Sequence, residues 1–133
     1  MKIFDVLKNG LVAGLIAALL NVVVFYVAVG MDAIPDSIIL PDGNKIGVIN
    51  FIISSIMPAV FASLIFLGIS KMSSNPKRVF GIVGYGFLII SEIPPFLIPG
   101  LSEGLRNTFL ISHIAAGVPI MMYLMSKAPK TQN

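Results

Sequence analysis

Glu92 and His113 are the two residues of this chain whose presence is hardest to explain by packing, because both lie within long apolar runs. Glu92 occurs in the stretch LIISEIPPFLIPG, residues 88–100, and His113 is the only histidine. Where apolar runs cross a membrane, such side chains usually face the bundle interior and find partners. Histidine titrates near physiological pH, so the pair can hold and exchange one proton. We therefore predict a site for a proton or a small solute.

Two adjacent prolines, Pro94 and Pro95, follow Glu92 almost directly. Proline has no N–H, so the carbonyls of Ile90 and Ser91 are expected to lose their helical partners. The residue before a proline also resists the helical conformation. We expect the helix to break there and to leave Glu92 at a helical C-terminus, where the dipole disfavours an anion. Freed carbonyls beside a carboxylate would attract a proton, a cation or a donor side chain.

Three further polar residues, Asn21, Asn50 and Arg106, are candidates for the same site. At ~1.5 Å per helical residue, Glu92 lies ~9 Å, His113 ~12 Å and Asn21 ~13 Å below one membrane surface. Asn50 falls near that surface, and Arg106 competes with His113 as the partner of Glu92. The shared depth predicts one polar site that opens to the outer side and takes a small-molecule ligand.

Each of these residues also has a purely structural interpretation. Glu92 can reach the outer interface along a kinked helix end and be hydrated there. His113 and Asn21 can hydrogen-bond between helices and do no chemistry. Asn50 can be the N-cap of a helix that starts at Phe51. Under this alternative the chain is an accessory or structural membrane protein whose polar residues only lock helices together.

The chain offers little for catalysis or metal binding. It has no cysteine, which removes thiol chemistry and disulfides. Ser91 and Ser112 adjoin Glu92 and His113, but successive helical residues point ~100° apart and form no triad. A single acid–histidine pair is too few ligands for a metal site, and a haem needs a second axial ligand. We expect no enzyme activity, no metal and no cofactor.

The composition indicates a membrane protein. Of 133 residues, 56% are hydrophobic and 11% are charged, and the mean hydropathy is +0.96. Soluble domains are about 45–50% apolar and about 25% charged. A globule this small has too little interior for the excess, which a lipid bilayer accommodates. The net charge of +3 follows membrane topology and does not indicate nucleic-acid binding.

Four apolar runs predict a bundle of four transmembrane helices, at residues 10–30, 48–69, 77–98 and 105–125. The first run would be ~31 Å long as a helix, which exceeds the apolar core of a signal peptide. The competing signal-peptide interpretation depends on Lys2 and Lys8, which precede the run, and on a cleavage-like AVG at residues 28–30. Pro58 and Pro119 lie inside the second and fourth runs and predict kinks that neighbouring helices must satisfy.

The distribution of basic residues predicts the orientation. Of the nine lysines and arginines, all but Lys45 and Arg106 fall on the side that carries both termini. The positive-inside rule therefore places both termini in the cytoplasm. We expect a multi-pass protein in the cytoplasmic (inner) membrane of a prokaryote.

The segments outside the membrane are short. The turn sequence PDGN at residues 41–44 separates residues 37–40 from residues 45–48, and these flanks are candidates for a small β-hairpin over the outer end. The tail, residues 127–133, is expected to be disordered.

Small residues predict where helices meet, because lipid provides no hydrophobic force between them. The first run carries a stripe spaced at three and four residues: Gly10, Gly14, Ala17, Ala18 and Asn21. One interpretation is packing within a single four-helix bundle. The other is a homo-oligomer seam through Gly10 and Gly14.

Three motifs resemble those of a known group: GLVAGLIAALLNVVVFY in the first run, IISEIPPF closing the third and ISHIAAGVP in the fourth. With the extended outer loop, they resemble small bacterial four-span membrane proteins classed only as a domain of unknown function. The resemblance implies a four-helix bundle in the cytoplasmic membrane and no activity. Small multidrug exporters differ, because their key carboxylate lies in the first span, where this chain has Asn21.

Overall fold

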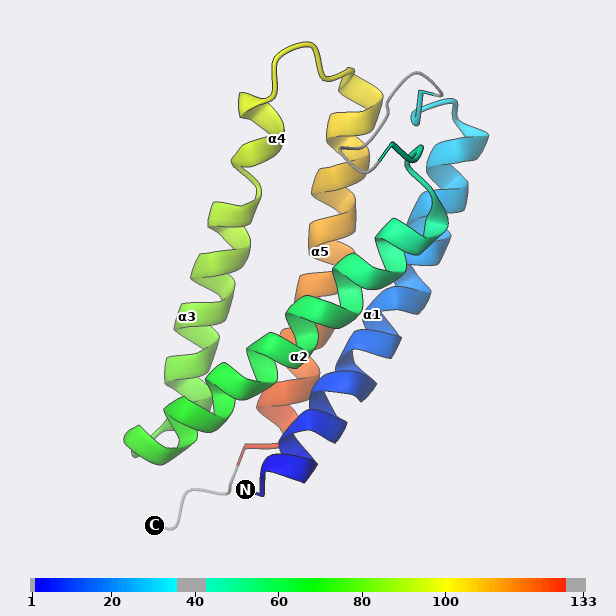
Figure 1. Cartoon of the computed structure of the whole chain (residues 1–133). Coiled ribbons are helices and arrows are strands. Elements are labelled where there is room, and N and C mark those ends of the chain that lie inside the picture. Colours follow the sequence, from blue (N-terminus) through cyan, green and yellow to red (C-terminus); the bar gives the residue numbers. More distant parts are fainter. Residues whose placement is uncertain (1, 36–42, 129–133) are drawn as a thin grey trace.

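The computed structural model describes residues 2–35 and 43–128, and these residues form four long helices and one short one (Figure 1). The helices are α1 (Ile3–Gly30), α2 (Val48–Met72), α3 (Pro76–Ser91), α4 (Pro94–Leu97) and α5 (Glu103–Ser126). No strand is assigned within these two described ranges. The short α4 continues the line of α3, so the bundle has four membrane-length segments.

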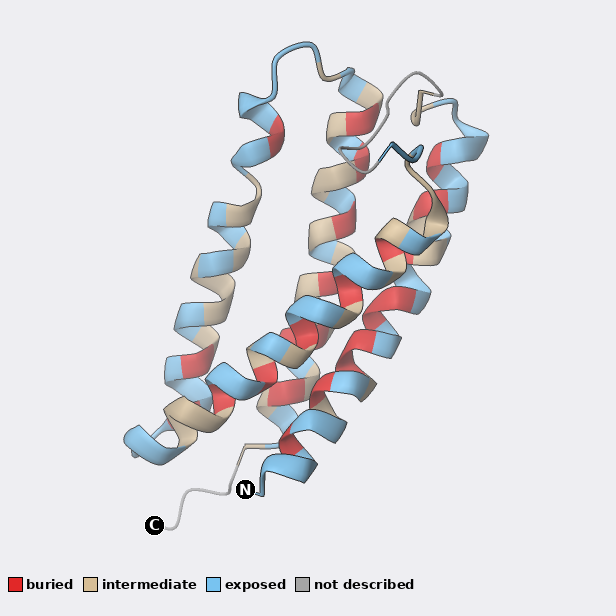
Figure 2. Ribbon diagram, viewed as in Figure 1, coloured by how far each residue is buried: buried red, intermediate tan, exposed pale blue. Residues whose placement is uncertain are grey.

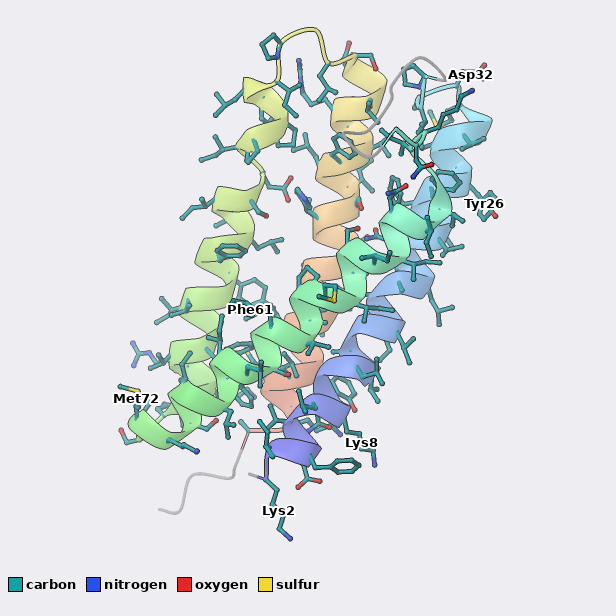
Figure 3. The ribbon with its side chains drawn as sticks, viewed as in Figure 1. Lys2, Lys8, Tyr26, Asp32, Phe61 and Met72 are labelled. Atoms are coloured by element: carbon teal, nitrogen blue, oxygen red, sulfur yellow. The ribbon has the colours of Figure 1, made fainter. Side chains whose placement is uncertain are left out.

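All four segments are long and apolar enough to cross a membrane. Their outward faces carry large exposed apolar side chains, including Leu19 and Phe87 at 71% and Phe61 at 65% exposure. Figure 2 shows the exposed residues on the outside of each helix and the buried ones facing the other helices. Tyr26 and Phe61 point away from the bundle (Figure 3). Such surfaces fit contact with a lipid bilayer, so the predicted four-helix membrane architecture is confirmed at this level.

The helix bounds differ from the predicted spans mainly at the N-terminus. α1 begins at Ile3 rather than Gly10, and Val6 in its first turns is fully buried. A hydropathy run marks the part of a helix that crosses lipid, whereas the helix itself extends as far as the backbone bonds and packing allow. Lys2 and Lys8 are exposed on this extension.

The tightest interface joins α1 and α2. A Cβ atom added at Gly14 would lie 2.8 Å from the Ile56 Cα, and one at Gly10 would lie 2.9 Å from the Val60 Cα. The glycine stripe therefore packs within this chain, backbone against backbone. Both glycines are buried against α2 within the chain, and the alternative of a homo-oligomer seam through Gly10 and Gly14 stays a prediction.

α5 lies behind α2 and between α1 and α3 (Figure 1). Gly117 receives the side chain of Leu88, and Gly84 receives the side chain of Met121. Near the connection between α2 and α3, the rings of Phe66 and Phe80 lie 4.7 Å apart. From that end α2 and α3 diverge, so the distal half of α3 packs on α5.

The helix break before the proline pair is confirmed. α3 ends at Ser91, the next two residues keep right-handed helical angles, and α4 starts at Pro94. As predicted, the carbonyl of Ile90 has no i+4 donor because residue 94 is proline, but it is not left free, since it accepts the N–H of Ile93 at 3.1 Å. The chain tightens to an i to i+3 bond at this point. The carbonyl of Ser91 is the one whose i+3 and i+4 positions are both prolines, which have no N–H to donate.

The other two intrahelical prolines do not end a helix. α2 and α5 are each continuous across Pro58 and Pro119. A single proline removes one backbone bond, and a long helix packed on neighbours absorbs that loss. Two adjacent prolines remove two successive backbone hydrogen bonds. This accounts for a helix break at Pro94 and Pro95 but not at Pro58 or Pro119.

The predicted hairpin is not seen in the described residues. Its first flank and most of its turn, residues 36–42, lie outside them, as do residues 129–133 of the predicted disordered tail. On the second flank, Lys45 forms an isolated bridge and Val48 already belongs to α2.

Candidate functional site

The acid–histidine pair, Glu92 and His113, comes together across the interface of α3 and α5. Glu92 is the C-cap of α3, and His113 lies in the third turn of α5. Oε1 of Glu92 is 3.8 Å from Nδ1 of His113. The side chain of Glu92 is 23% exposed and that of His113 is 43% exposed. This separation is within ion-pair range but longer than a hydrogen bond of about 2.7–3.2 Å. The sequence prediction that these two residues meet agrees with this geometry.

The facing atoms of the acid–histidine pair are out of contact with water and lack hydrogen-bond partners. This holds for Oε1 and Oε2 of Glu92 and for Nδ1 of His113. A polar group left unsatisfied in this way costs about 1–3 kcal/mol, and more if it is charged. A proton shared between the two groups, or a donor or cation placed between them, would remove that cost.

Arg106 does not serve as the partner of Glu92. Its guanidinium lies over the ring of Phe96, 5.5 Å from the ring centroid. Its Nε is buried without a hydrogen-bond partner. Because Phe96 lies about one helical turn beyond Glu92, Arg106 is placed nearer than His113 to the end of the bundle where α4 meets α5.

Asn21 lies apart from the acid–histidine pair and makes the interhelical hydrogen bond of its structural interpretation. It is 1% exposed on α1, and its Nδ2 donates to Oγ of Ser55 on α2 at 2.8 Å. The Ser55 hydroxyl in turn donates to the carbonyl of Phe51 at 2.7 Å. The depth estimate was compatible with a shared site, but depth does not fix the direction of a side chain. Asn21 therefore links α1 to α2.

Asn50 caps α2, although not from the predicted position. The helix starts at Val48 rather than Phe51, with the extended residue Gly47 as its N-cap. Asn50 is the third helical residue, and its Oδ1 accepts the N–H of Gly47 at 2.8 Å. A side chain at this position can reach back to satisfy a free N–H of the first turn. Among residues 2–35 and 43–128, its amide NH₂ has no hydrogen-bond partner.

A cavity of about 210 Å³ lies between α2 and α5 and includes His113 in its wall. Its other lining side chains include two rings, Phe51 and Phe109, and three polar groups, Asn50, Ser54 and Ser112. His113 therefore contacts Glu92 on one side and the cavity on the other. The sequence reasoning missed the serines and rings of this wall. The four-residue spacing of Asn50 and Ser54 marks a shared helix face.

Two further observations limit the chemistry of the site. The hydroxyl of Ser91 donates to the carbonyl of Leu88 at 2.7 Å, so it serves its own helix. Among residues 2–35 and 43–128, no group of three His, Cys, Asp or Glu residues could hold a metal ion.

Four apolar helices of membrane-spanning length, with an acid–histidine pair between α3 and α5, fit a small polytopic α-helical membrane protein. The chain belongs to a family of unknown function, DUF6069, whose model matches residues 3–130. This match confirms the resemblance seen in the three sequence motifs. No curated protein and no solved structure matches the chain.

Proposed function

We propose that this protein binds a proton or a small solute at an intramembrane polar site formed by Glu92 and His113, and transports it where the site gains access to both sides. The observation that supports this proposal is the 3.8 Å approach of Oε1 to Nδ1, with neither atom hydrogen-bonded. An ion pair built only for stability would be expected to close to hydrogen-bond distance. A pair held slightly open retains room for an exchanging proton or a small donor.

The proposed orientation places both termini in the cytoplasm. Lys2 and Lys8 lie at the end of the bundle where α1 begins, and Asp32 lies at the opposite end (Figure 3). Lys71 and Arg78 flank the connection between α2 and α3, at the same end as the N-terminus (Figure 1). The positive-inside rule favours this basic end as cytoplasmic. The acid–histidine pair then lies in the outer half, in the inner membrane of a prokaryote.

A binding role is proposed in preference to catalysis. The site has an acid and a base, but the nearby hydroxyl of Ser91 is committed to its own helix. Acyl or phosphoryl transfer would require a nucleophile within reach of a base and donors for the developing charge. Proton exchange requires only the two titrating groups.

The chain's single histidine provides a direct test. Protein labelled with ¹⁵N-histidine and reconstituted in lipid nanodiscs gives one imidazole spectrum, which is followed over pH. Interacting groups titrate in coupled macroscopic steps. We expect two steps in the wild type and one in Glu92→Gln. Glu103→Gln, an exposed carboxylate change in the first turn of the same helix, should leave two steps. A wild-type curve indistinguishable from that of Glu92→Gln would refute the proposal.

Transport is tested separately with proteoliposomes. After a pH jump, we expect proton or solute flux in the wild type and a loss of flux in Glu92→Gln. Equal flux in both would remove the transport part of the proposal and leave the binding part to the titration.

A structural role is a second candidate, and the Asn21–Ser55 bond favours it. This 2.8 Å bond joins two helices, and neither residue lines the cavity between α2 and α5. If Glu92 and His113 act in the same way, Glu92→Gln and His113→Ala should lower the melting temperature in detergent. Unchanged melting temperatures would weigh against this candidate.

A further inference from the structure

The cavity between α2 and α5 is partly open and has room for a small occupant. Its volume is about 210 Å³. An apolar cavity of about 150 Å³ holds a benzene ring, whereas drug-sized pockets measure about 300–1,000 Å³. The space therefore suits one ring, or a short alkyl group, with a small head group attached. Phe51 and Phe109 provide apolar surface for such a body.

Some hydrogen-bonding groups of the polar side chains in the wall are already used, and others are not. The Oδ1 of Asn50 is used by the N–H of Gly47, so its NH₂ is left to donate. The hydroxyl proton of Ser54 is donated to the carbonyl of Phe51 at 3.1 Å. The Nδ1 of His113 faces Glu92, so Nε2 is left for the cavity. One donor from α2 and one ring nitrogen from α5 thus remain available for an occupant.

We propose that this cavity binds a small, mostly apolar molecule with one hydrogen-bond-accepting head group, a carbonyl or a carboxylate. The NH₂ of Asn50 and the Nε2–H of His113 donate to the head group, and the two phenylalanine rings cover the body. This inference rests on the proposed function in one respect, because His113 takes part in both.

The shared histidine connects occupancy of the cavity with proton binding. When the imidazole carries both protons, Nδ1–H faces Glu92 and Nε2–H faces the head group. The charged groups around it are Glu92 from α3 and Arg106 from its own helix, which lies over Phe96. The polar side chains that α2 contributes to the wall, Asn50 and Ser54, are uncharged. An acceptor in the cavity and the carboxylate of Glu92 therefore face opposite nitrogens of one ring.

Four one-ring probes test the assignment in nanodisc-reconstituted protein, with empty nanodiscs as the blank. They are the 4-fluoro derivatives of benzamide, benzoate, benzylammonium and toluene, followed by ¹⁹F NMR. One net hydrogen bond corresponds to a factor of about ten. We expect the benzamide and the benzoate to bind about tenfold more tightly than the toluene. Equal or tighter binding of the toluene or the benzylammonium would overturn the assignment.

Variants locate the probe. Ser54→Leu fills the cavity and should abolish benzamide binding. Ser70→Leu is the matched control, because Ser70 also donates to its own helix, at 2.7 Å to Phe66, but lies outside the cavity. Asn50→Asp keeps the acceptor that caps α2 and removes the donor, so benzamide should bind about three- to tenfold more weakly. Retained binding in Ser54→Leu, or undiminished binding in Asn50→Asp, contradicts the inference.

The two proposals can fail separately. Probe binding is measured at one pH with no gradient, whereas the histidine titration is measured without any probe. Two coupled titration steps with no benzamide binding would reject the cavity ligand and keep the proton site. Benzamide binding with a single titration step would do the reverse.

Discussion

Replacing Gly14 by alanine should destabilise the bundle, although alanine is the better helix former. The new Cβ would lie 2.8 Å from the Ile56 Cα and 3.2 Å from the Ala59 Cβ. Carbon atoms pack at about 3.5–4.0 Å, so α1 and α2 must separate by ~0.7–1.2 Å. The closest neighbour is backbone and cannot rotate away. Overpacking of this kind costs about 1–3 kcal/mol.

The matched control is Gly68→Ala in the interior of α2. Nothing lies within 4 Å of a Cβ at that position, so only the helix propensity changes. Alanine is favoured over glycine there by about 1 kcal/mol. Gly14→Ala gains the same helix propensity but is also destabilised by the overpacking. The two variants should therefore differ by ~1–3 kcal/mol in free energy of unfolding, with Gly14→Ala the less stable.

The measurement is reversible unfolding by SDS titration in mixed micelles, with helicity followed by circular dichroism. Adding Ala59→Gly to Gly14→Ala removes one of the close contacts but not those to the backbone of Ile56. We expect only partial rescue in this double variant, compared with Ala59→Gly alone. Equal stability of Gly14→Ala and Gly68→Ala would refute the close approach of the two helices.

Three further changes test other contacts. Asn21→Ala should cost about 0.5–2 kcal/mol in the same assay, because Ser55 loses its partner; the loss should be smaller in a Ser55→Ala background. Asn50→Ala should cost ~1 kcal/mol as a lost helix cap, whereas Asn50→Asp should be near wild type. Phe96→Leu frees Arg106 to reach the nearby carboxylate, so the histidine titration should change to one step. Phe96→Tyr keeps the ring and should retain two steps.

The membrane architecture was predictable from the sequence because it depends on length and composition. Four apolar runs specify four spans whatever their tertiary partners are. The break at Pro94 was predictable as well, because two missing N–H groups are a local chemical fact. The fate of the Ile90 carbonyl was not, since it depends on how far the backbone tightens to find another donor.

The site was only partly predictable, because the depth of a residue in the membrane does not say in which direction its side chain points. Topology gave Glu92, His113 and Asn21 similar depths, but rotation about the helix axis decides which of them face each other. Asn21 shares its face with Gly10 and Gly14, and those glycines hold α2 against α1. That stripe already predicted the helix-packing face. Asn21 is the last residue of that stripe, which marks the packing face of α1 without identifying the helix that packs there.

The contact between Arg106 and Phe96 bears on whether the site can exchange a proton at all. Arg106 and His113 are seven residues apart on α5, a rise of ~10.5 Å or about two helical turns, so they lie at different depths in the bundle. Arginine stays protonated at any physiological pH. Paired with Glu92, it would form a static ion pair with no proton to give. The ring of Phe96 holds the guanidinium at another depth and leaves a histidine opposite the carboxylate. In the proposed function, the aromatic contact therefore keeps the partner of Glu92 titratable.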